Sequence, residues 1–98
     1  MIDQIDENVR TRLQAAVAQH ADAMIGFAQR AIQTRSLPGE EQELATLVKQ
    51  EMERLGYDEV WIDRVGNVIG VLKGQGQGRS VQFNAHLDHV HEGDPALW

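Results

Sequence analysis

Apolar residues recur every three or four positions along the first third of the chain, which is the spacing of one helix face. They are Ile5, Val9, Leu13, Val17, Met24, Ala28 and Ile32. This pattern predicts a helix that ends near Thr34, and the acidic residues Asp3, Asp6 and Glu7 suit its positive N-terminal end. Unbroken, this helix would be roughly 45 Å long at ~1.5 Å per residue. We therefore expect a break near residues 20–22.

A second helix is predicted from about Glu40 to Leu55. Its apolar positions share one face, and they are Leu44, Leu47, Val48, Met52 and Leu55. Gly56 can cap its end. The preceding residues 36–39, Ser-Leu-Pro-Gly, separate the two helices, because proline lacks an amide donor and glycine turns freely.

The second half of the chain is predicted to form strands. Residues 58–63 and 68–72 are short and rich in β-branched or apolar residues, with a turn at 65–67 between them. After a glycine-rich connection, residues 80–85 alternate between apolar and polar. Two helices followed by three strands predict an α/β fold with a layered sheet that is covered on both sides.

The composition reduces the number of functional classes to which the chain can belong. A chain of 98 residues suffices for one domain, and its 42% hydrophobic and 24% charged residues are ordinary for a globular protein. The net charge of -6 opposes binding to nucleic acid or to an anionic membrane. With no cysteine, any metal must be held by His, Asp, Glu or backbone oxygen. An acidic start and the lack of an apolar run of ~20 residues favour a cytoplasmic location.

Chemically active side chains concentrate in residues 86–94, the His86–Asp94 segment. It carries three of the four histidines and three carboxylates, directly after the last predicted strand. In extended backbone His86 and Asp88 point to the same side. A carboxylate beside an imidazole can orient a metal ligand, although this spacing also arises by chance in proteins without a metal. The pair is therefore a candidate metal site.

The order of these segments resembles the metallopeptidase and deacylase family of acetylornithine deacetylase, succinyl-diaminopimelate desuccinylase, aminoacylase and the glutamate carboxypeptidases. Residues 36–41 resemble the loop entering the family's second helix, residues 55–57 the exit of that helix, and residues 66–68 the hairpin turn. Residues 81–88, Val-Gln-Phe-Asn-Ala-His-Leu-Asp, are similar to the strand that carries the family's first metal-binding motif. Gly93, Asp94 and Trp98 resemble the stretch after it.

The resemblance implies a metal-dependent amide hydrolase that cleaves an N-acyl amino acid or a short peptide. It implies two divalent ions, usually zinc, with cobalt and manganese as alternatives. His86 would ligate one ion, and Asp88 would be the catalytic carboxylate that modulates it. Two ions about 3.5–4 Å apart polarise an amide carbonyl and lower the pKa of a bound water to about 7.

The resemblance also implies that residues 1–98 are the N-terminal part of a layered zinc-hydrolase catalytic domain. The bridging aspartate, the general-base glutamate, the other ligands and a lid domain that forms a homodimer would follow Trp98. Because a catalytic zinc site needs about three protein ligands, we expect these residues alone to hold metal weakly and to be inactive.

The sequence is also consistent with other hypotheses for these residues and for the function of the chain. His89 falls where the family commonly has a small or polar residue, and His91 falls in a variable loop of the family. We expect both to be exposed loop residues. A single-metal site could instead form from His86, His89, His91 and Glu92. The chain could be an inert small domain that binds a partner or one metal through the His86–Asp94 segment, or its sheet edge could pair with another copy. His20, on the apolar stripe, is expected to be partly buried.

Overall fold

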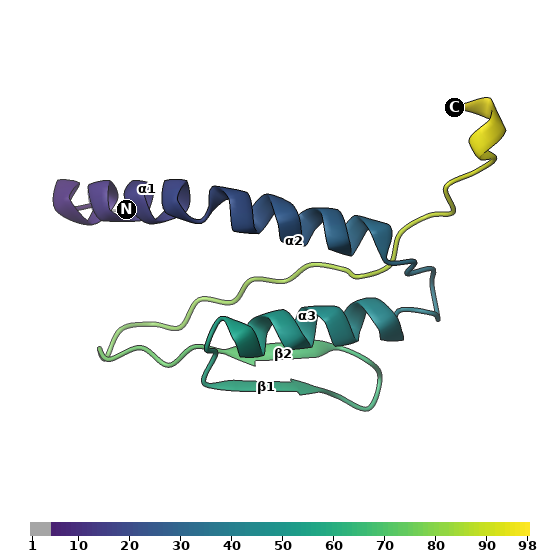
Figure 1. Cartoon of the computed structure of the whole chain (residues 1–98). Coiled ribbons are helices and arrows are strands. Elements are labelled where there is room, and N and C mark those ends of the chain that lie inside the picture. The colour runs from purple at the N-terminus through teal and green to yellow at the C-terminus, as the bar shows by residue number, and fades with distance from the viewer. Residues whose placement is uncertain (1–4) are drawn as a thin grey trace. The chain divides into compact units, whose positions relative to one another are not determined.

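The computed structural model describes residues 5–98, so Asp3 lies outside the described part. Figure 1 shows the elements, which are α1 (Glu7–Gln19), α2 (Ala21–Gln33), α3 (Gln42–Arg54), β1 (Glu59–Ile62), β2 (Val68–Val71) and the 3-10 helix η1 (Pro95–Leu97). The chain forms two compact units, one up to Ile32 and one from Gln33 onwards. The predicted α/β class is confirmed.

The first unit consists of two consecutive helices, and the expected break falls at His20. The side chain of Asp6 caps α1 by accepting a hydrogen bond from the Asn8 amide at 2.8 Å. The His20 amide closes α1 on the Ala16 carbonyl at 3.1 Å, and the His20 carbonyl accepts the Met24 amide at 2.9 Å as α2 begins. None of the described helices is long and apolar enough to cross a membrane.

The apolar stripe of the first unit remains exposed. Neither α1 nor α2 contains a buried residue, and Val17 and Met24 are 63% and 58% exposed. The expectation that His20 is partly buried was wrong, because its side chain is exposed. A helical stripe becomes buried only where another element covers it, and α1 and α2 do not pack against each other.

In the second unit, α3 ends in a Schellman motif. The Tyr57 amide donates to the Met52 carbonyl at 3.1 Å and the Gly56 amide to the Glu53 carbonyl at 3.1 Å. This geometry requires a left-handed residue, and Gly56 supplies it with φ +82°. The predicted helix and its glycine cap are confirmed.

The two strands form an antiparallel hairpin, as predicted. Val60 pairs with Gly70 and Ile62 with Val68. The turn is organised by Asp63, whose carboxylate accepts hydrogen bonds from the Asn67 amide at 2.9 Å, from the Asn67 side chain at 2.9 Å and from the Val65 amide at 3.0 Å. These bonds lower the pKa of the Asp63 carboxyl, the Asn67 side chain contributing most.

Helix α3 packs against both strands of the hairpin. The contact centres on Gly70, where a Cβ atom would lie 2.7 Å from the Met52 sulfur and 2.7 Å from the Tyr57 ring. Val60, paired with Gly70, shares this face because paired residues point to the same side. The opposite face carries Trp61, which is 42% exposed. Within the second unit, only α3 packs against the sheet, so no described element of that unit provides the expected cover of the second face.

The expected third strand at residues 80–85 was also wrong. These residues follow β2 as a connection without regular secondary structure (Figure 1), and Phe83 is 94% exposed. Alternation alone does not make a strand, since its amides and carbonyls must be paired with a neighbouring strand. Within residues 5–98, β1 and β2 pair only with each other.

Candidate functional site

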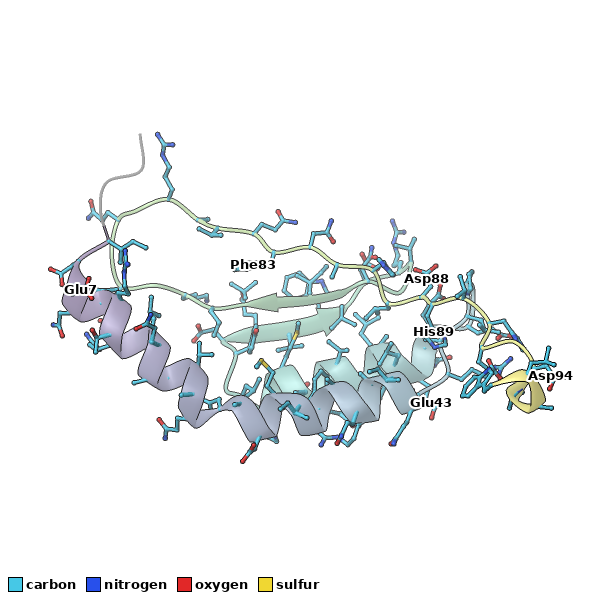
Figure 2. All side chains as sticks on the ribbon, turned by 90° about the horizontal axis from the view of Figure 1, so that it is seen from above. Glu7, Glu43, Phe83, Asp88, His89 and Asp94 are labelled. Carbon is cyan, nitrogen blue, oxygen red and sulfur yellow. The ribbon has the colours of Figure 1, made fainter. Side chains whose placement is uncertain are left out.

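The His86–Asp94 segment touches the rest of the second unit at one place. Leu87, Asp88 and His89 are partly buried, whereas the residues on either side of them are exposed. Figure 2 shows Asp88 and His89 next to each other and Asp94 farther along the chain beside η1. The contact point is the loop between α2 and α3.

His86 and Asp88 lie together, as their spacing predicted. The Nδ1 atom of His86 is 2.7 Å from the Asp88 carbonyl oxygen and 3.3 Å from the carboxylate oxygen Oδ1. Because a carbonyl oxygen can only accept, Nδ1 carries a proton, and in the neutral imidazole the lone pair is then on Nε2. The closer partner of the imidazole is therefore the backbone of Asp88 rather than its carboxylate.

This arrangement fits one metal ligand. The side chain of His86 is 84% exposed, so the side chain that carries Nε2 is accessible to solvent. An imidazole that donates Nδ1–H to a carbonyl oxygen and offers Nε2 is the usual form of a metal-binding histidine. Within residues 5–98, however, no three His, Asp or Glu side chains gather as a group that could hold a metal. The described residues thus supply one candidate ligand.

His89 differs from its expectation, because it is partly buried and bonded to the loop before α3. Its amide donates to the Ser36 carbonyl at 2.8 Å, and its Nε2 accepts the Ser36 amide at 3.0 Å. The expected exposed loop residue therefore anchors the segment. Its Nε2 is occupied and is not offered to a metal.

His91 is exposed, as expected, and its contacts are local. Its Nδ1 accepts the Gly93 amide at 3.0 Å and lies 3.7 Å from the Glu92 carboxylate. Glu92 also pairs with Arg35 at 3.2 Å. The pKa of the Glu92 carboxyl is lowered, first by its own backbone amide and further by the charge and the hydrogen bond of Arg35. A site combining His86, His89, His91 and Glu92 is not assembled.

The end of the described chain is held by short-range bonds. The Asp94 carboxylate caps η1 by accepting the Ala96 amide at 3.0 Å, and the indole of Trp98 donates to the Glu92 carbonyl at 3.3 Å. Asp94 therefore has a capping role in this structure. An open groove at the start of α3, which includes Glu40 and Glu43, contains none of these residues.

Sequence reasoning missed the two contacts that join the segment to the loop before α3. They are the bonds between Ser36 and His89 and the ion pair between Arg35 and Glu92. Each joins residues more than 50 positions apart. In the sequence, only the opposite charges of Arg35 and Glu92 could have indicated one of these contacts. Many other pairs of residues in the chain also carry opposite charges.

Comparison with known proteins finds relatives that match part of this chain. The chain is 40% identical over 69 residues to a Pyrococcus abyssi protein named "Putative LysW-lysine/LysW-ornithine hydrolase", covering 70% of this chain and 20% of that protein. It is 41% identical over 59 residues to "Uncharacterized protein YgeY" of Escherichia coli strain K12, covering 60% of this chain and 14% of that protein.

The chain thus spans between 14% and 20% of the length of these curated relatives. No protein-family model matches it. No solved structure matches it significantly. The comparisons therefore indicate relatedness to a protein named as a hydrolase, and they leave the reaction and the metal open.

Proposed function

We propose that this chain contributes His86 as one ligand of the metal site of a metal-dependent hydrolase that cleaves amide bonds. The observation that carries the proposal is the state of His86, with Nδ1 bound to the Asp88 carbonyl at 2.7 Å and Nε2 accessible on an exposed side chain. A relative named as a hydrolase supports the reaction class. The resemblance of residues 81–88 to a metal-binding motif supports the role of His86.

In this proposal each described residue has a limited task. His86 keeps its proton on Nδ1 and so presents Nε2 to a cation. Asp88 places a carboxylate 3.3 Å from Nδ1, where its negative charge favours this orientation of the imidazole ring. The metal ions would supply the polarisation of the amide carbonyl and an activated water.

The remaining ligands are proposed to come from parts of the protein beyond the described residues. No ligand group of three lies within residues 5–98, and the relatives are roughly three to four times as long as the chain. We propose the same for the bridging carboxylate, the general base and the lid domain, with zinc as the resident metal and a homodimer as the assembly. Residues 1–98 would then be the N-terminal part of a catalytic domain.

The test uses the natural protein that contains these residues. We expect it to hydrolyse N-acyl amino acids or short peptides, to lose activity when a chelator removes the metal, and to regain it with zinc or cobalt. His86→Ala should lower both metal content and turnover. His20→Ala is the matched control, because His20 is also exposed but lies in the first unit. Hydrolysis that survives chelation, or full metal content in the His86→Ala variant, would contradict the proposal.

A second measurement concerns the 98-residue chain itself. With one candidate ligand, it should bind zinc weakly. Elemental analysis that finds tight, stoichiometric zinc, unchanged in the His86→Ala variant, would show that the ligand has been assigned to the wrong residue.

A further inference from the structure

One peptide group, the unit joining Asp88 to His89, is hydrogen-bonded on both of its sides. Its carbonyl oxygen lies 2.7 Å from His86 Nδ1, and its amide donates to the Ser36 carbonyl at 2.8 Å. Because a peptide unit is planar and stiff, the bond to His86 and the bond to Ser36 both depend on the orientation of the same peptide plane. A chain of hydrogen bonds therefore runs from Ser36 to the imidazole of His86, and bonds in such a chain strengthen one another.

The imidazole of His89 completes the attachment of Ser36. The Ser36 amide donates to Nε2 at 3.0 Å, so residue 89 binds both backbone polar groups of Ser36. His89 Nδ1 lies 3.0 Å from the Val90 carbonyl oxygen and so carries the proton. The Thr34 carbonyl oxygen is farther from Nε2, at 3.5 Å, which leaves the Ser36 amide as the stronger partner.

The hydrogen bonds of Ser36 are important because this residue is buried. Ser36 is 0% exposed, and the other buried residues among positions 5–98 are Leu44 and Ala45. Because Ser36 has no exposed surface, bulk water does not contact its backbone groups, and its hydroxyl has no hydrogen-bond partner among the described residues. A Ser36 amide that lost the His89 acceptor would have no solvent to replace it. The loop would then have to move.

We propose that His89 is a positioning residue for His86. Its imidazole fixes Ser36, the Ser36 carbonyl fixes the plane of the Asp88–His89 peptide, and the carbonyl of that peptide holds His86 with its proton on Nδ1. Nε2 of His86 is thereby offered to a divalent cation. Only this last consequence rests on the proposed function, since the hydrogen bonds themselves involve no metal.

The test compares three variants of the chain by nitrogen-15 NMR without metal. His89→Leu removes the acceptor, and His89→Gln restores one, because its side-chain oxygen is as many bonds from Cα as Nε2. His91→Leu is the matched control, since His91 is a neighbouring histidine with local contacts. The readouts are hydrogen exchange of the Ser36 amide and the position of the proton on the His86 ring.

In the unmodified chain, we expect the Ser36 amide to exchange at least about tenfold more slowly than the exposed Val81 amide, as a buried bonded amide should. His89→Leu should abolish this protection and should leave the His86 proton distributed over both nitrogens. His89→Gln and His91→Leu should keep both properties. Unchanged signals from Tyr57 and Gly70 would show that α3 still packs on the hairpin.

Two results would overturn the proposal. An unprotected Ser36 amide, or a His89 proton on Nε2, in the unmodified chain would show that the bond does not form, whether or not the variants fold. Loss of Ser36 protection in His89→Leu with an unchanged His86 ring would show that His89 does not position His86. Neither readout depends on hydrolysis, so failure of the proposed enzyme function would be seen separately, as absent metal-dependent turnover.

Discussion

The sulfur of Met52 lies 2.7 Å from the position that a Cβ atom on Gly70 would occupy. Helix α3 therefore approaches β2 at the one residue of the strand that has no side chain. The Tyr57 ring comes equally close, and Tyr57 and Met52 are already joined by the backbone bond that ends the helix. Helix end and strand glycine thus form a single packing unit.

Gly70→Ala should destabilise the second unit. The added methyl group would overlap Met52 and Tyr57, and overpacking of this kind costs about 1–3 kcal/mol. Urea unfolding followed by Trp61 fluorescence measures the change. Gly74→Ala is the matched control, because nothing lies within 4 Å of its Cβ position, and it should change stability by less than about 0.5 kcal/mol. Equal stability of the two variants would contradict the packing.

Gly56→Ala should also destabilise, for a different reason. Its Cβ position is open, but its φ of +82° is in the left-handed region, where an alanine costs about 1–2 kcal/mol. Gly56→Asn should cost less, because asparagine tolerates this conformation. The same urea experiment ranks the variants. If alanine and asparagine cost the same, backbone strain is not the cause.

Asp63 should titrate below the usual aspartate pKa of about 3.9. The hydrogen bonds from Asn67 favour the ionised form, so the folded-state pKa lies below the unfolded one. The resulting stability is present above the unfolded pKa and is lost as pH falls through the folded pKa. Carbon-13 NMR titration of the carboxyl measures it. Asn67→Ala should return the pKa towards its ordinary value, whereas Asn84→Ala, which removes an exposed amide that does not bond to Asp63, should not.

Asp88→Asn tests the proposed role of the carboxylate, in the metal-loaded form that the proposed function implies. The backbone carbonyl that binds His86 is retained, so the metal should stay bound, while loss of the charge should lower turnover about 10–100-fold. Steady-state kinetics and metal analysis give the two readouts. Asp94→Asn is the control, because asparagine can still cap η1. Unchanged turnover in Asp88→Asn would make Asp88 a structural residue.

Most secondary structure could be predicted because its causes are local. The break at His20, the glycine cap at Gly56 and the turn between the strands each follow from residues within a few positions of one another. The predicted strand at residues 80–85 failed because a strand also needs a partner, which alternation cannot supply. The buried environment predicted for His20 failed similarly, since burial depends on a second element.

The candidate site likewise has a local part that could be predicted and long-range contacts that could not. The spacing of His86 and Asp88 by itself determined that the two residues lie together, because residues two apart in extended chain share a side. Only the tertiary structure decided that the Asp88 carbonyl is the closer partner of His86 and that His89 binds Ser36, 53 positions away. The physical reason is that periodicity and spacing encode local geometry, whereas a hydrogen bond between distant segments depends on how the folded chain brings them together.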